Sequence, residues 1–127
     1  MIKSIFILST LSLIQLASAA MGNSRDVSTY ANIEEVFATH VDMDFLVDFD
    51  RQVLDGNVVI TFKTAIENVT SVFLDAEGLY ITRVEYMTMD EPSTWRTVNY
   101  FMTRPNGNLG DAVEVLMPAM LPANETF

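Results

Sequence analysis

Cysteine is absent from the 127-residue chain, and histidine and tryptophan each occur once. Without cysteine the protein can form no disulfide and offers no thiolate as a nucleophile or metal ligand. The single histidine, His40, cannot make a typical zinc site alone, because such sites take about four His, Cys, carboxylate or water ligands. No serine lies in a G-x-S-x-G motif. The sequence therefore favours a non-catalytic domain that is held by packing or by a larger partner.

Basic residues are scarce as well. Seven Lys and Arg residues face seventeen Asp and Glu residues, which gives a formal net charge of −10. Nucleic acids and anionic lipid surfaces are bound through basic patches. From this charge balance we expect the protein to bind neither nucleic acid nor an anionic lipid surface.

Long apolar runs are confined to the N-terminus. The segment MIKSIFILSTLSLIQLASA, residues 1–19, begins with Lys3, continues with an apolar stretch and ends on the small residues Ala17-Ser18-Ala19. This order is typical of a secretory signal peptide, and the apolar stretch is shorter than the roughly 20 residues that span a bilayer. We expect a protein that is secreted or resident in the secretory-pathway lumen, with no membrane attachment after cleavage. A retained membrane anchor and an N-terminal core helix are the alternatives.

Residues 20–38 are polar and weakly patterned, which predicts an N-terminal arm. From residue 39 the apolar side chains recur at every second position, as in a β-strand with one buried face. The apolar members of this row are Val41, Met43, Phe45, Val47 and Phe49. A turn at Leu54-Asp55-Gly56-Asn57 and a second alternating strand, 58–65, would complete an antiparallel hairpin.

Four further apolar segments, 70–75, 79–87, 95–102 and 112–118, are separated by turn-rich stretches at 75–78, 90–93 and 104–108. Short strands at such intervals predict an all-β protein, an antiparallel β-sandwich over residues 39–127. The aromatic residues Tyr80, Tyr86, Trp95 and Tyr100 are expected to be core or half-buried strand residues, with a ligand-binding aromatic patch as the lesser alternative.

Acidic residues form the most conspicuous candidate for chemistry. Asp42, Asp44, Asp48 and Asp50 share the even positions of the first strand with His40. A calcium loop starting at Asp48 would need glycine at its sixth position, where Val53 stands. We therefore interpret the row as the solvated face of a strand and predict no metal, cofactor or catalytic residue. The pairs Glu34-Glu35 and Asp90-Glu91 are too common in acidic proteins to indicate a glycosidase.

Two other motifs have modest weight. The segment Gly107-Asn108-Leu109-Gly110 lacks the lysine of a phosphate-binding loop and is predicted to be a turn. The sequons that start at Asn68 and Asn124 are possible N-glycosylation sites in a secreted protein.

The stretch THVDMDFLVDFDRQVLDGNVVITFKT resembles the first hairpin of the N-terminal domain in zinc metalloaminopeptidases, a family that includes aminopeptidase N and the leukotriene epoxide hydrolase. The next stretch, VTSVFLDAEGLYITRVEY, is similar to that family's L-D-x-x-x-L-x-I segment, and GDAVEVLMPAMLPANETF to its later strand and turn. The resemblance covers about residues 28–127 and is closer to the leukotriene hydrolase branch. It implies a saddle-like β-sandwich, truncated at its C-terminal end before a catalytic domain.

In that family the zinc, the H-E-x-x-H helix and the G-x-M-E-N segment belong to the later catalytic domain, and none of them occurs in this chain. The family's substrate-contacting Gln or Glu is matched by neither Gln15 nor Gln52. The resemblance thus implies a scaffold that forms one wall of a peptide-binding cleft, with the catalytic domain as its partner. The alternative is a stand-alone secreted β-sandwich module that binds a protein or a glycan.

Overall fold

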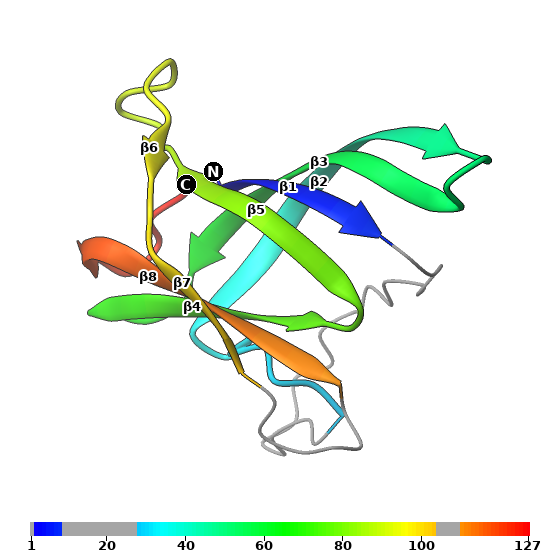
Figure 1. Ribbon diagram of the computed structural model, residues 1–127. Helices are drawn as coiled ribbons and strands as arrows, with labels where there is room; N and C mark the ends of the chain where they lie inside the picture. Colours follow the sequence, from blue (N-terminus) through cyan, green and yellow to red (C-terminus); the bar gives the residue numbers. More distant parts are fainter. Residues whose placement is uncertain (1, 9–27, 104–109) are drawn as a thin grey trace.

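The computed structural model describes the backbone of residues 2–8 and the whole of residues 28–103 and 110–127, and every regular element in these parts is a β-strand. The strands are β1 (Ile2–Leu8), β2 (Val36–Asp48), β3 (Val53–Thr64), β4 (Val69–Ala76), β5 (Leu79–Tyr86), β6 (Arg96–Thr97), β7 (Tyr100–Thr103) and β8 (Asp111–Leu121) (Figure 1). All their pairings are antiparallel. The prediction of an all-β antiparallel protein is confirmed.

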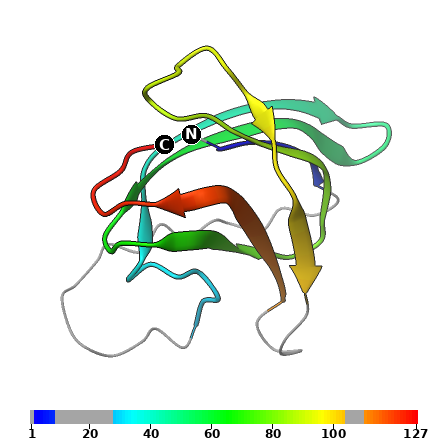
Figure 2. The ribbon, with the colours of Figure 1, turned by 90° about the vertical axis from the view of Figure 1, so that its left-hand side faces the viewer.

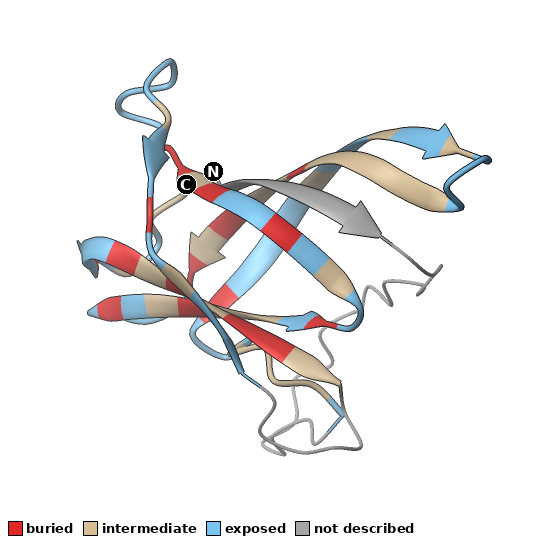
Figure 3. Ribbon diagram, viewed as in Figure 1, coloured by how far each residue is buried: buried red, intermediate tan, exposed pale blue. Residues whose placement is uncertain are grey.

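The strands form two sheets, one in the order β2-β3-β1-β5-β6 and one in the order β4-β8-β7 (Figure 2). A single cluster of buried side chains draws on both sheets, and buried positions recur along strands of each (Figure 3). Its most deeply buried members are Phe127, Val72, Val84 and Val115. Both sheets therefore share one hydrophobic core, which is the main source of stability in a domain without disulfides.

The hairpin of β2 and β3 is present, but its predicted turn is wrong. The chain reverses at Phe49–Gln52, where Gln52 has a φ of 55°. Gly56 instead lies inside β3, opposite Phe45. A Cβ atom on Gly56 would be 2.0 Å from the backbone oxygen of Asp44, so glycine is needed there for close strand approach rather than for a turn.

The first strand of the hairpin does not bury its whole apolar row. A β-bulge between Ala38 and His40 changes which face points to the core, so that Val36 is buried before it and Val41 and Phe45 pack on the core after it. Beyond Phe45 the hairpin extends past the core (Figure 1). Val47 and Phe49 are therefore exposed, which corrects the expectation of a fully buried odd face.

Later strands also differ from the prediction in their limits. The expected strand 95–102 is split into β6 and β7, and β8 runs on through Pro118 to Leu121. Tyr86 is buried as expected, whereas Tyr80 is exposed. The predicted turn at 104–108 lies outside the described residues.

The N-terminal part departs most from the expected division of the chain. Ile2–Leu8, inside the expected leader, form β1 between β3 and β5. Residues 9–19 lie outside the described part, and leader cleavage stays a prediction. The arm predicted for residues 20–38 is described from residue 28, and its last three residues already belong to β2.

At the other end of the chain, Thr126 forms an antiparallel bridge with Lys63. Phe127 is fully buried, and its ring centroid lies 5.7 Å from that of Phe62 and 6.5 Å from that of Tyr86. The C-terminal residue thus closes the core at the end where β3 finishes.

Candidate functional site

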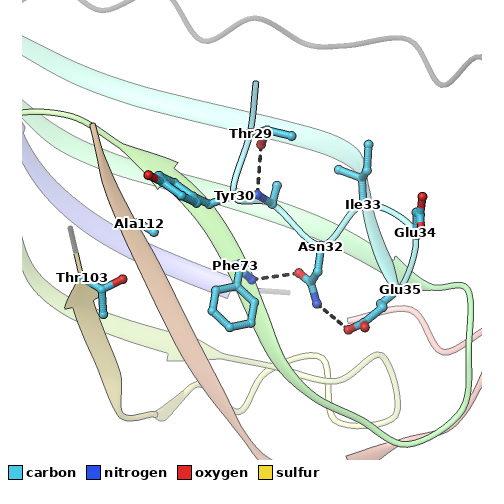
Figure 4. Close-up of a pocket in the computed structure, with 10 residues that line it drawn as sticks. Thr29, Tyr30, Asn32, Ile33, Glu34, Glu35, Phe73, Thr103 and Ala112 are labelled. Carbon is cyan, nitrogen blue, oxygen red and sulfur yellow. Dashed lines mark hydrogen bonds between the residues drawn. The ribbon is translucent and has the colours of Figure 1, made fainter. Parts of the chain in front are cut away.

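A hollow with a volume of about 440 Å³ lies beside the arm that precedes β2 (Figure 4). Arm residues 29–35 form one side of it, and Phe73 of β4, Thr103 of β7 and Ala112 of β8 form the other. Beside it the arm, which is hydrogen-bonded to β4 of the second sheet, leads into β2 of the first sheet.

Asn32 binds the edge of β4 as an additional strand would. Its side-chain oxygen accepts a hydrogen bond from the Phe73 N–H at 2.9 Å, and its side-chain nitrogen donates to the Ser71 carbonyl at 3.1 Å. The same nitrogen lies 2.9 Å from a carboxylate oxygen of Glu35 (Figure 4). Because β4 is an edge strand, these bonds satisfy backbone groups that would otherwise be open to another chain.

A second set of hydrogen bonds holds the arm to β4 nearer its start. The hydroxyl of Thr29 and the backbone N–H of Tyr30 both donate to the carboxylate of Asp75, the latter at 2.7 Å. The Thr29 oxygen in turn accepts from the N–H of Ala31 at 3.0 Å. Asn32 and Asp75 therefore fix the arm on β4, and this hollow is best described as a structural joint.

Asp42 and Asp44 are exposed on β2, whereas Asp48 is half-buried at its end and Asp50 lies in the turn that follows. The Nε2 atom of His40 lies 3.2 Å from a carboxylate oxygen of Asp42, with side chains 66% and 71% exposed. In the part of the chain that the structure describes, no three His, Asp or Glu side chains converge as metal ligands. Glu91, from the other acidic pair, binds Arg96 and is exposed too.

Asp48 differs from its neighbours in the row because it closes the hairpin turn. One of its carboxylate oxygens accepts from the backbone N–H of Arg51 at 2.8 Å, and the other from the Arg51 guanidinium at 2.7 Å. The backbone hydrogen bond first, and the guanidinium second, hold the pKa of Asp48 below its ordinary value. The same contact raises the pKa of Arg51.

Sequence reasoning missed an apolar surface at the outer end of this hairpin. Leu46, Val47 and Phe49, which we call the hairpin tip, are 69%, 50% and 85% exposed. Met43, earlier on β2, is 48% exposed. The alternation that indicated a strand was correct, but it could not show that the strand outruns the core. Exposed apolar residues gathered at one end of an element are a candidate contact surface.

Both sequon asparagines occupy exposed turn positions. Asn68 has a φ of 62° just before β4, and Asn124 has a φ of 63° between β8 and the C-terminus. The backbone N–H of Asn124 donates to the Thr64 carbonyl at 3.0 Å, which leaves its side chain outside this bond. Glycosylation at either residue stays a prediction.

No protein-family model matches the chain, and no curated protein matches it. Among the described residues there is no helix long and apolar enough to cross a membrane.

Proposed function

We propose that this chain is the non-catalytic N-terminal β-sandwich of a secreted zinc aminopeptidase-like protein. Three features support the proposal: the order of the sequence segments that resemble the family, the antiparallel hairpin β2–β3 at its start, and the two sheets that share a core. Hydrolysis of N-terminal residues from peptides would belong to the whole parent, whose later domain would hold the zinc. The role of this chain is to frame one wall of the substrate cleft.

The hairpin tip is the observation that carries the proposal. Three neighbouring apolar side chains at the end of a projecting hairpin expose surface that the domain itself does not bury. Interfaces between domains of one chain bury such patches, and their central residues are apolar and aromatic. Phe49 is the best anchor, because it is the most exposed of the large apolar residues.

The parent can be tested by sequencing the transcript through and beyond codon 127. The proposal predicts an open frame that continues into segments encoding G-x-M-E-N and H-E-x-x-H. A stop codon directly after Phe127 in the mature transcript would overturn it.

The alternative, a stand-alone secreted binding module, would use the same hairpin tip for a protein partner. The two functions differ in what the secreted chain needs. A module is recovered as a folded monomer in light scattering. A cleft wall is recovered in soluble form only when the parent's catalytic domain is co-expressed.

A further inference from the structure

β1 lies between β3 and β5 and forms backbone pairs with both of them along its whole length. β1 pairs with β3 from Ile2↔Ile60 to Leu8↔Leu54, and with β5 from Ile2↔Tyr86 to Leu8↔Leu79. Both pairings are antiparallel, so β3 and β5 run parallel to each other and are separated by the width of one strand. If β1 left, two backbone edges about 9.5 Å apart would lose their partners together.

The C-terminal residues lie on the same edge of β3 as β1. Phe62 and Phe127 exchange two backbone hydrogen bonds, at 2.8 and 3.1 Å, and Thr126 pairs with Lys63. Lys63 and Phe62 of β3 therefore face Thr126 and Phe127. Thr61 comes next, and from Ile60 onward β3 faces Ile2 and the rest of β1. The N and C marks lie side by side in both views (Figure 1, Figure 2).

The direction of the chain is the same in both pieces. Residues 126 and 127 face Lys63 and Phe62 in descending order, and residues 2 to 8 continue that order from Ile60 to Leu54. One strand running on from Phe127 would need a single residue opposite Thr61 before it reached the place of Ile2. The C-terminal segment and β1 are thus two parts of one strand line.

We propose that the place of β1 is a strand-acceptor site, which takes an extended segment of the parent protein that runs on from Phe127 once the leader has been removed. The inference rests on the proposed function for the source of the strand, and on cleavage of residues 1–19. The occupant is antiparallel to β3 and β5, about seven residues long, and held by main-chain hydrogen bonds as in strand addition to a sheet.

The alternation of hydrogen bonds along β3 gives a residue-level test. Because Phe62 bonds toward Phe127, the even-numbered amides of Val58 and Ile60 face the acceptor site, and the odd-numbered amide of Val59 faces β2. The first experiment determines the N-terminus of the chain secreted from a eukaryotic host. Amide hydrogen exchange is then measured with and without the synthetic peptide IKSIFIL, the segment seated there in the structure.

If the secreted chain begins near residue 20, we expect the peptide to slow amide exchange at Val58 and Ile60 by about tenfold or more, with little change at Val59. The matched control is the same peptide with an N-methyl group on the residue equivalent to Ser4, which keeps the side chains but removes the amide that faces Val58 of β3. Retention of residues 1–19 in the secreted product would overturn the proposal, as would amides that are protected without peptide or equal effects of both peptides.

A second variant keeps the test decisive if the secreted product aggregates. Residues 20–127 are followed directly by a copy of residues 1–8, so that the copied Met1 falls opposite Thr61 and the copied strand enters the site in cis. We expect a soluble, cooperatively melting protein. The same fusion with Ile5→Pro in the copied strand should melt more than about 10 °C lower or not fold.

Equal behaviour of the two fusions would show that the site needs no strand and would overturn the proposal. These outcomes are independent of the transcript. A stop codon after Phe127 combined with specific peptide protection would leave the acceptor site intact and make its occupant a segment of another protein.

Discussion

The two ends of the β2–β3 hairpin differ sharply although one continuous pair of strands forms both. At the core end Val36, Phe62 and Thr64 are buried, and Phe127 closes over them. At the outer end Leu46, Val47 and Phe49 are exposed beside a turn that is held by Asp48 and Arg51. Apolar side chains are nevertheless frequent at both ends.

This difference teaches that a period of two identifies a strand without saying how much of it the domain covers. The core end is covered by segments distant in sequence, among them the C-terminal residues and Tyr86 of β5. At the outer end β3 pairs with β1 as far as Leu54, but Leu46, Val47 and Phe49 stay exposed. We therefore expect the core end to determine stability and the outer end to determine association.

Phe127→Ala should have the largest effect on this contrast. It removes a fully buried ring that stacks on Phe62 and meets Tyr86 edge-on, and it should lower the free energy of unfolding by about 3–5 kcal/mol. The matched control is Phe49→Ala at the hairpin tip, which should change it by no more than about 0.5 kcal/mol. Urea unfolding of the full 127-residue chain, which retains β1, measures both. Similar losses in the two variants would contradict the division between the ends.

Thr64→Val should have the next largest effect. The Thr64 hydroxyl donates to the Pro122 carbonyl at 2.6 Å and accepts from the N–H of Glu125 at 2.8 Å, and the side chain is fully buried. Valine keeps the shape but leaves these two groups unpaired, at a cost of about 2–4 kcal/mol. Thr97→Val, on an exposed strand, is the control and should be nearly neutral. A neutral Thr64→Val would show that the C-terminal loop is not fixed by this hydroxyl.

Leu46→Lys should change the free energy of unfolding by no more than about 0.5 kcal/mol but should reduce self-association. The expected readouts are weaker binding of an apolar fluorescent dye and less self-association in sedimentation velocity, since a charge interrupts the apolar tip. Met120→Lys is the control. Met120 is 68% exposed against 69% for Leu46, but it belongs to β8 of the second sheet. If both substitutions reduce dye binding equally, the hairpin tip is not a distinct contact surface.

Much of the fold follows from local pattern, and the failures have physical causes. Alternation correctly indicated the hairpin and the strands at 70–75 and 79–87, because side-chain direction is a local property. The turn was misplaced because Asp55-Gly56 has the composition of a turn, whereas its glycine serves a close contact with Phe45. The bulge at Thr39 and the place of Ile2–Leu8 in the sheet depend on pairing between distant segments, which no local pattern specifies.

The candidate sites divide in the same way. The aspartate row could be interpreted from strand geometry alone, and its exposed members agree with a solvated face. The joint made by Asn32 with Ser71 and Phe73 could not, because an asparagine in a polar arm carries no indication of the edge strand it will bind. The hairpin tip was hidden for the opposite reason: Val47 and Phe49 were expected on the buried face of the strand.

The smallest expected effect lies in the turn at the outer end. Because the pKa of Asp48 is lowered by folding, its bonds to Arg51 stabilise the hairpin above the ordinary carboxyl pKa of 3.8 and are lost as pH falls below it through the folded value. A carboxyl-detected NMR titration should show this lowered pKa in the unsubstituted chain. Arg51→Gln should raise it only part of the way to 3.8, since the backbone N–H of residue 51, which is the larger cause, still donates. A complete return to 3.8 would mean that the guanidinium, not the turn backbone, holds the outer end together.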